Sequence, residues 1–487
     1  MTETTINTET GPAVGGSGVV GFEPGNNGVA NRAALQGAID ALGAAGGTVR
    51  VERAGVYDLA GTVYMGSDTA LVFGAGVIVR KTEEAGGFSH VILNKGALTK
   101  TWDRRVRVEG LRLMVNGVDV RSDTVPGLRG QVAFFYASDV RVIGLRCDDL
   151  GPQQFGVHVC TFEDLVVEDC IIKGDKDGVH LGRGKRFAVR GCVFQTRDDA
   201  VALNAHDYAT SNPELGWIEQ GVVERCYDLA APAGKAHESV GYFCRVLAGS
   251  WGDWRGGMSV QQSDTVVMRG DGLPGGGRLY RVQAEPDGTR YVSRTCPSHD
   301  AGVEVVDGIP WLMMQEGVEA SAGVRDVVFR DITLEKPRPG FSVHFDRDRY
   351  SRSYYPGSEP PVQRGLVMED VRVFHGGDSP VLLIGTPVDV VTLSRVTLGA
   401  GGVLVHDKGE VGADGRESTQ TTVQLEGCRY VREGEMDLLE QRWAGKRVRL
   451  TTRGSVVMAE GFKARVARGQ GVGAVDVESD LPGLARH

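Results

Sequence analysis

The chain has 487 residues, 70 of which are glycines, and its formal net charge is −9. The glycines follow no three-residue period, which excludes collagen, and so much glycine is typical of a fold with many tight turns. The acidic balance and the lack of a basic run argue against nucleic acid as a partner. No run approaches 18 apolar residues, which argues against a transmembrane helix and a membrane location.

Residues 1–28 form a polar lead-in. This segment does not show the basic stretch followed by an apolar stretch that marks a secretory signal. We therefore expect a cytoplasmic protein, or a secreted one if a signal peptide has been removed.

Residues 31–44 have the pattern of an amphipathic helix, because Leu35, Ala38, Ile39 and Leu42 fall at positions i, i+3, i+4 and i+7. Two glycines then end the helix, and a strand follows. This order resembles the N-terminal cap of pectin-lyase-like β-helices. In such a cap, a helix covers the open end of the core and its unpaired strand edges.

An internal repeat follows the predicted cap. Three segments, starting at Asp139, Asp164 and Phe187, align without gaps, and their ends superpose in steps of 22 residues. Each segment holds short alternating strands that cannot bury an apolar face alone, so copies must stack. A period near 22 suits one coil of a parallel β-helix. The sequence therefore predicts an all-β fold, a right-handed parallel β-helix with an N-terminal capping helix.

Similar strand patterns before and after these coils extend the predicted stack from about residue 47 to 460. Residues 206–320 do not keep the period, and they read as antiparallel strands with turns, which predicts an inserted β subdomain. The predicted organisation is a lead-in (1–28), the cap and first coils (29–205), the inserted subdomain (206–320), later coils (321–460) and a tail (461–487).

Cys147, Cys170 and Cys192 recur at steps of 23 and 22, so we expect them to stack inside the core as a ladder. The close cysteine pairs that zinc sites use do not occur. We therefore expect neither a structural metal nor a disulfide framework, and no feature of the sequence calls for a cofactor.

Three aspartates occupy matching places in two of the repeats. Asp177 and Asp199 differ by 22, so they should point the same way from coils stacked about 4.8 Å apart. Asp198 is the neighbour of Asp199. Three carboxylates on one patch repel one another, which raises at least one pKa and leaves a protonated acid beside ionised bases. Glycoside cleavage requires this arrangement. The alternative is that the aspartates only form turns.

The two motifs that hold these aspartates are DKDGVHL (175–181) and RDDAVALN (197–204). They resemble the NTDGxD and QDDCxAxN signatures of glycoside hydrolase family 28, the polygalacturonase family, which is built on a right-handed parallel β-helix. The resemblance implies that Asp198 is the general acid. It implies that Asp177 and Asp199 activate the attacking water, with inversion at the anomeric carbon.

The sequence departs from the family pattern in several places. The family's GHG signature should follow about 20 residues later, but the nearest similar string, RGGMSV (255–260), has Gly256 in place of the histidine. The RIK motif, which binds the uronate carboxylate, is not recognisable. Asp175 replaces the first asparagine and His180 replaces the second acidic residue. These departures favour a hydrolase of this clan whose substrate is not galacturonate, such as a neutral sugar.

Further polar and aromatic residues near the motifs or in the insertions are predicted to bind substrate: His180, Asn204, His206, Arg197, Asp175, Trp254, Arg255, Asp346 and Arg347. Each has a structural alternative. His180 and His158 would form a histidine ladder, the tryptophans would form the core of the insertion, and the charges after His344 would be a solvated loop.

We therefore expect an enzyme, an inverting glycoside hydrolase that acts on oligosaccharides or polysaccharides in an exo mode, as a monomer or small homo-oligomer. Exo action is expected because the insertion could close one end of the groove. Two alternatives remain open at this stage. One is a β-helix polysaccharide lyase or glycosyl-transferring enzyme, and the other is a non-catalytic carbohydrate-binding β-helix.

Overall fold

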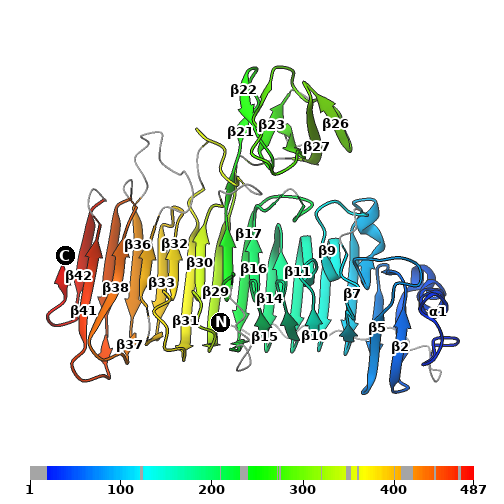
Figure 1. Ribbon diagram of the computed structural model, residues 1–487, viewed down its shortest axis with the longest axis horizontal. Coiled ribbons are helices and arrows are strands. Elements are labelled where there is room, and N and C mark those ends of the chain that lie inside the picture. The colour runs from blue at the N-terminus through cyan, green and yellow to red at the C-terminus, as the bar shows by residue number, and fades with distance from the viewer. Residues whose placement is uncertain are drawn as a thin grey trace.

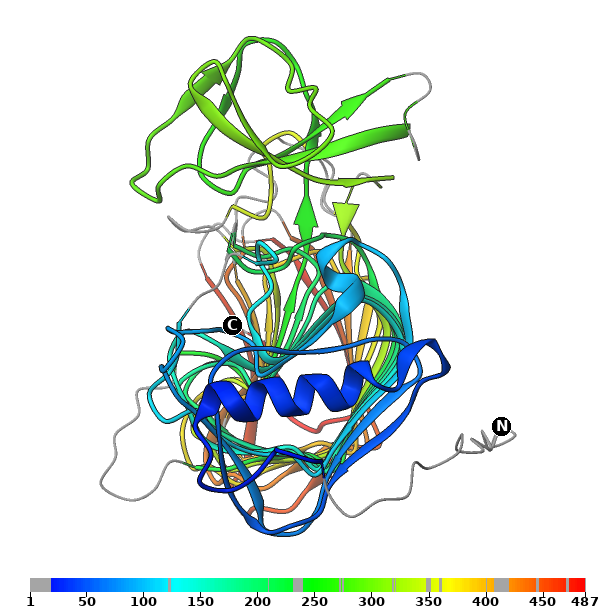
Figure 2. The ribbon, with the colours of Figure 1, turned by 90° about the vertical axis from the view of Figure 1, so that its right-hand side faces the viewer.

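The computed structural model describes residues 19–486 except 121–123, 209, 231–239, 271–272, 274–275, 318, 320, 347–351, 359–360, 400, 407–419, 444–445 and 470–472. The described chain is nearly all β. Its one α-helix, α1 (Gly28–Asp40), lies across one end of a long stack of strands (Figures 1 and 2). None of the helices described is long and apolar enough to cross a membrane.

The stack consists of three parallel ladders, in which each strand pairs with its equivalent on the next coil. Ladder A carries the candidate site, and its strands are β3 (Val63–Met65), β6 (Ile92–Asn94), β9 (Gly130–Ile143), β11 (Phe155–Glu168), β13 (Val179–Leu181), β16 (Val201–Asn204), β19 (Cys244–Leu247), β30 (Phe341–His344), β32 (Leu382–Ile384), β35 (Val403–Val405), β38 (Glu435–Gln441), β41 (Lys463–Arg468) and β43 (Ala485–Arg486).

Ladder B follows ladder A around each coil, and β9 and β11 run through both. Its other strands are β1 (Gly47–Val51), β4 (Thr69–Phe73), β7 (Asp103–Glu109), β14 (Gly184–Arg190), β17 (Ile218–Glu224), β29 (Val324–Leu334), β31 (Arg364–Val373), β33 (Val390–Ser394), β36 (Thr421–Glu426), β39 (Val448–Arg453) and β42 (Val475–Ser479).

Ladder C closes each coil, and β29 and β31 reach into it. Its other strands are β2 (Gly55–Leu59), β5 (Val77–Lys81), β8 (Arg112–Met114), β10 (Arg146–Leu150), β12 (Ile171–Gly174), β15 (Val193–Thr196), β18 (Tyr227–Asp228), β34 (Thr397–Leu398), β37 (Arg429–Tyr430) and β40 (Val456–Val457). Two short 3₁₀ helices, η1 (Gly43–Ala45) and η2 (Lys95–Leu98), complete the N-terminal part. The predicted parallel β-helix is thus confirmed.

The 22-residue step predicted from the sequence is the register of ladder A. Val157 pairs with Val179, which pairs with Val201, and all three side chains are buried in the core. His158 and His180 lie between these inward positions and therefore point away from the core. The period thus fixes which side chains face the candidate site.

The capping helix begins three residues earlier and ends four residues earlier than its predicted bounds of 31–44. The Asn27 side chain caps it by accepting a hydrogen bond from the backbone N–H of Ala30 at 2.8 Å. Leu35 and Ile39 are buried against the first coils. Figure 2 shows the helix lying across the end of the stack. The predicted cap is confirmed, with its bounds corrected.

The insertion is shorter than the predicted 206–320, because β17, β18 and β19 form one more complete coil within that range. Two long connections in this coil, before β17 and between β18 and β19, hide the 22-residue period. The chain leaves the stack only at β20 (Gly249–Ser250) and returns at β28 (Ser321–Ala322), and these two strands pair antiparallel.

The insertion projects from one side of the stack and has a small core of its own (Figure 1). Its strands are β21 (Gly252–Asp253), β22 (Met258–Val260), β23 (Thr265–Arg269), β24 (Gly277–Val282), β25 (Tyr291–Ser293), β26 (Val303–Val306) and β27 (Ile309–Glu316). A five-stranded sheet has the order β21-β23-β24-β27-β26, and β22 pairs with β25.

Two further expectations need correction. Residues 461–487 are not only a tail, because β41, β42 and β43 continue the ladders. Cys147 pairs with Ile172 and so lies outside the predicted cysteine ladder. Cys226 lies there instead, at the position before β18 that Cys170 and Cys192 occupy before β12 and β15. The period of 22 holds, but the phase of Cys147 differs by two residues.

Candidate active site

The three predicted aspartates lie together in two stacked turns. Asp177 precedes β13, and Asp198 and Asp199 precede β16, so the register brings them to one place. One oxygen of each carboxylate lies within 4.8 Å of one oxygen of each of the others. Asp177 and Asp199 are 3% and 1% exposed, whereas the Asp198 side chain is 17% exposed. Asp198 is therefore the carboxylate of the three that a ligand reaches most easily.

The aspartates open into a cavity of about 290 Å³ on the outer side of ladder A. Phe155 stacks on the His180 ring at 4.1 Å and also lies under the Arg129 guanidinium at 4.9 Å. The described residues that line the cavity are Arg129, Phe155, Lys176, Asp177, His180, Asp198, Asp199, Asp207, Tyr208, Ser211, Val240, Tyr242, Arg245, His344 and Asp346.

Lys176 supplies a positive charge beside the aspartates. Its ammonium forms an ion pair with Asp198 across the stacked turns. Burial acts to raise the pKa of Asp198, but Lys176, and to a lesser extent Arg245, outweigh it and leave that pKa below its ordinary value. Asp198 is therefore ionised in the empty site at neutral pH.

Asp199 has the opposite electrostatic environment. Burial and the charges of Asp198 and Asp177 raise its pKa to about 7, even though the backbone N–H of Tyr242 donates to Asp199 Oδ1 at 2.8 Å. The three carboxyl groups thus hold a proton near neutral pH, as the sequence predicts. The proton rests on Asp199, the most buried of the three.

Gly241 allows the next coil to approach these turns. A Cβ atom on Gly241 would lie 2.6 Å from the backbone nitrogen of Asp199 and 2.6 Å from its Oδ1. Any larger residue would push the Tyr242 N–H away from Asp199. This coil, and not the predicted string 255–260, follows the aspartate motifs in the stack, since Met258–Val260 is strand β22 of the insertion.

Asp177 is fixed by a chain of buried groups. His180 Nδ1 lies 2.8 Å from Asp177 Oδ2, and His180 Nε2 lies 3.2 Å from Asp207 Oδ2. Burial acts against a charged imidazole, but the two flanking carboxylates raise the pKa of His180 above its ordinary value. The side chain of Asn204 donates to Asp207 Oδ2 at 2.6 Å. These contacts hold Asp177 Oδ2, whereas its Oδ1 has no hydrogen-bond partner within the described part of the chain.

The opposite wall of the cavity is built around Arg245. Its guanidinium forms an ion pair with Asp346, and its Nη1 lies 3.9 Å from Asp199 Oδ2. His344 Nε2 lies 3.0 Å from Asp346 Oδ1. Burial acts to lower the pKa of Arg245, but Tyr208, Asp207 and Asp199 outweigh it and raise that pKa. Arg245 therefore stays charged and partly balances the aspartates.

Of the residues predicted to bind substrate, the structure places His180 and Asp346 in the cavity. Asn204 is fully buried behind it and acts through Asp207. Asp175 and Arg197 are partly exposed but do not line the cavity, because they precede the turns whose later residues point inward. Arg347 lies outside the described residues.

Three predicted binding residues are placed elsewhere. His206 is fully buried against Gly249, and burial, followed by the charge of Arg281, lowers its pKa to about 3, so it is a neutral packing residue. Trp254 belongs to the core of the insertion, where its Nε1 donates to Ser293 Oγ at 2.9 Å. Arg255, its exposed neighbour, does not line the cavity.

The sequence interpretation missed Lys176, Arg129, Tyr242 and Arg245. Lys176 stands inside the first motif and one coil below Asp198, so the 22-residue step contained the signal. Arg245 lies opposite Ala202 in the register, but the long connection before β19 concealed this position. Arg129 reaches the site through its contacts with Gln153 and Ser211, which no sequence spacing reveals.

Three carboxylate oxygens at this spacing are close enough to share a cation. The Lys176 ammonium already occupies the side of Asp198, and calcium needs about six to eight oxygen ligands. We therefore expect that EDTA will leave the rate of any hydrolysis within about twofold of its untreated value. Loss of activity in EDTA with recovery in added Ca²⁺ would instead assign a cation to the aspartates.

No protein-family model matches the chain, and no curated protein matches it. Among solved structures, the chain is similar to a family 28 exopolygalacturonase of Yersinia enterocolitica, at 12% identity over 96% of this chain and 77% of that chain, with a TM-score of 0.45. It is similar to the catalytic unit of a GH87 α-1,3-glucanase of Streptomyces thermodiastaticus, at 13% identity over 99% and 70%, with a TM-score of 0.46. It is also similar to the Streptococcus pneumoniae surface protein and adhesin PfbA, at 11% identity over 96% and 98%, with a TM-score of 0.44.

Proposed function

We propose that this chain is a glycoside hydrolase whose chemistry is carried by Asp177, Asp198 and Asp199. The observation that carries the proposal is the pairing of a reachable carboxylate, Asp198, with a buried neighbour whose pKa is about 7. Two interacting carboxyl groups that share one proton provide an acid and a base at neutral pH.

The proposed reaction moves one water and one proton. Asp198 gives the shared proton to the leaving oxygen as the bond between that oxygen and the anomeric carbon breaks. Water attacks the anomeric carbon and loses a proton to Asp177 or Asp199. Asp177 suits this role because His180 holds its Oδ2 while Oδ1 has no described partner. The net change is hydrolysis of the bond, and the site regains its single proton.

Inversion of the anomeric carbon is part of the proposal. Inverting enzymes commonly keep about 6.5–9.5 Å between their carboxyl groups and retaining enzymes about 5–5.5 Å, so a spacing within 4.8 Å alone would favour retention. Burial argues the other way. Asp177 and Asp199 are too enclosed to bond a sugar carbon directly, but they are accessible to a water molecule. The resemblance to family 28 also implies inversion.

The charges in the cavity favour a neutral sugar over a uronate. Five carboxylates line it against three cationic side chains, and these cations already have acceptors. Lys176 pairs with Asp198, Arg245 pairs with Asp346, and Arg129 donates to the Gln153 carbonyl and Ser211. A substrate carboxylate would therefore meet net negative charge.

The proposal is tested by incubating the protein with neutral and uronic oligosaccharides and with aryl glycosides, and by following the first-formed anomer by NMR. We expect hydrolysis of a neutral oligosaccharide from one chain end, with inversion. An unsaturated product would indicate a lyase, and binding without cleavage would indicate a carbohydrate-binding protein. A retained anomer would make one aspartate a nucleophile.

The pH dependence of hydrolysis tests the shared proton. A carboxyl group with a raised pKa keeps its proton below that pKa and loses it above. We therefore expect kcat/KM to fall about tenfold per pH unit above about pH 7, because kcat/KM reports the essential groups of the free enzyme. In Lys176→Met this fall should move to higher pH, since the cation that favours ionised Asp198 is gone. A flat profile across pH 7 would contradict the assignment.

A further inference from the structure

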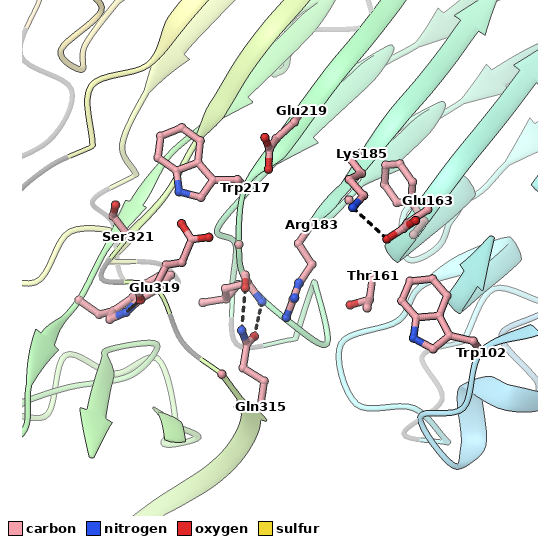
Figure 3. A pocket seen from close by; sticks show the side chains of 16 residues that line it. Trp102, Thr161, Glu163, Arg183, Lys185, Trp217, Glu219, Gln315, Glu319 and Ser321 are labelled. Atoms are coloured by element: carbon pink, nitrogen blue, oxygen red, sulfur yellow. Dashed lines mark hydrogen bonds and ion pairs between the residues drawn. The ribbon is translucent and has the colours of Figure 1, made fainter. Parts of the chain in front are cut away.

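A second cavity, of about 210 Å³, lies where the insertion leaves the stack. One wall is the corner between ladders A and B, and the other is formed by the two connections to the insertion (Figure 3). The walls are held together by described hydrogen bonds. The Gln315 side chain exchanges two hydrogen bonds with the Leu215 backbone, at 2.7 and 2.9 Å, and Trp251 Nε1 donates to the Glu319 carbonyl at 2.7 Å. The cavity is therefore a fixed part of the fold.

Two indole rings stand at opposite sides of this cavity. Figure 3 shows Trp217 on one side and Trp102 on the other, with the Arg183 side chain between them. Trp102 is 39% exposed, although such a large apolar ring is normally buried. The Arg325 guanidinium lies 4.8 Å from the Trp217 ring centroid, which helps to fix that ring.

Arg183 is held at the base of the cavity by a buried carboxylate. Its Nη1 lies 3.2 Å from Glu214 Oε2, and the Glu214 side chain is 0% exposed. Thr161 and Tyr136 also donate to Glu214, each at 2.8 Å. A guanidinium carries five N–H donors, so Arg183 can hold Glu214 and still offer donors to a ligand in the cavity.

The charges around this cavity are paired within the protein. Glu163 lies 3.1 Å from Lys185 Nζ and 2.9 Å from Arg186 Nη2, and Glu219 lies 2.7 Å from Arg325 Nη2. A charged ligand would have to break these pairs, whereas a neutral polyhydroxyl ligand would not. Sugar rings offer one face of C–H groups that packs on indole and hydroxyl groups that accept N–H donors.

We propose that this cavity is a second saccharide-binding site, which holds part of a neutral oligosaccharide or polysaccharide between Trp102 and Trp217. The inference rests on the proposed function, because it takes the substrate to be a saccharide. Arg183 follows His180 of the first cavity by three residues, or about 10 Å along the strand. The connection that includes Tyr208 and Leu215 separates the two cavities. The second site therefore adds affinity for long chains next to the aspartates.

The first test uses Asp198→Asn protein, which binds without cleaving, labelled with 5-fluorotryptophan. The chain has six tryptophans, so six fluorine signals can be assigned by single Trp→Phe substitutions. The probes are cello-, xylo-, manno- and arabino-hexaoses. We expect the bound hexaose to shift the Trp102 and Trp217 signals and to leave the signal of Trp311, buried in the insertion, in place.

The second test measures affinity by titration calorimetry in the same background. Trp102→Ala and Trp217→Ala should each weaken hexaose binding by at least about tenfold. Phe374→Ala is the matched control, because Phe374 is an aromatic side chain, 67% exposed, that lines neither cavity. Native melting of each variant is verified first, and the fluorine experiment decides if a variant does not fold.

The outcomes separate the two proposals. Hydrolysis of a hexaose by the wild type with unmoved Trp102 and Trp217 signals would overturn the second site alone. A shift of these signals without hydrolysis would support the site and contradict the proposed enzyme. Neither hydrolysis nor binding of any probe would overturn both.

Discussion

Asp198→Asn is expected to lower kcat by about 10³-fold while leaving the fold intact, because general acid catalysis contributes about 10²–10⁴-fold. Asparagine has the size of aspartate but cannot pass the shared proton to a leaving oxygen. The main-chain contacts of residue 198 stay, since Arg338 and Thr196 donate to its carbonyl oxygen and not to its side chain. The measurement is kcat on whichever oligosaccharide the wild type hydrolyses, with circular dichroism to verify folding.

Asp148→Asn is the matched control for this variant. Asp148 is an aspartate on ladder C that also lies beside a lysine, with its Oδ1 3.2 Å from Lys173 Nζ, but it lines neither cavity. Its ion pairs are exposed, so its removal should cost only about 0–1 kcal/mol of stability and no activity. If Asp198→Asn keeps more than about a tenth of the wild-type kcat, Asp198 is not the acid.

The sequence predicts the arrangement of the aspartates because a stacked fold turns a spacing of 22 residues into adjacency. That argument needs only Asp177, Asp199 and the period. The interval of 43 residues between Ala202 and Arg245 defeats it, because the connections before β17 and β19 add residues that no stacking rule predicts. The wall of the cavity that carries Arg245 and Tyr242 therefore becomes visible only in the structure.

Side-chain burial was the second limit of the sequence interpretation. His206 and Trp254 are of residue types that often bind sugars, but whether they face a cavity depends on what packs over them. Gly249 lies against His206, and Ser293 takes the indole N–H of Trp254. Both contacts come from the insertion or its connections, whose internal packing has no period in the sequence. Residue type alone therefore gave the wrong location for both residues.

Arg338→Leu is expected to have the largest effect on stability, about 3–5 kcal/mol of unfolding free energy, because it leaves a buried carboxylate without its partner. The side chains of Arg338 and Asp228 are each 1% exposed, and the guanidinium donates to both oxygens of Asp228, at 2.9 and 2.6 Å. The measurement is the denaturant midpoint and the melting temperature. Asp228→Asn should cost less, since it removes the uncompensated charge.

Arg395→Leu provides the control of like chemistry. Arg395 also donates to both oxygens of one aspartate, Asp370, at 2.8 and 2.7 Å, but these side chains are 51% and 42% exposed. Water screens this pair, so its loss should cost about 0–1 kcal/mol. Equal losses in the two variants would show that burial does not set the strength of the Arg338 pair.

The Arg338 pair also links stability to the candidate active site. Arg338 Nη1 donates to the Asp198 carbonyl at 2.5 Å, and Lys336 on the same connection donates to the carbonyl of Thr196. The turn that presents Asp198 is thus held from the coils that follow the insertion. Where Arg338→Leu still folds, kcat should fall as well, because the carboxylate is no longer held in position. Full activity in the folded variant would mean that the stacked turns alone position Asp198.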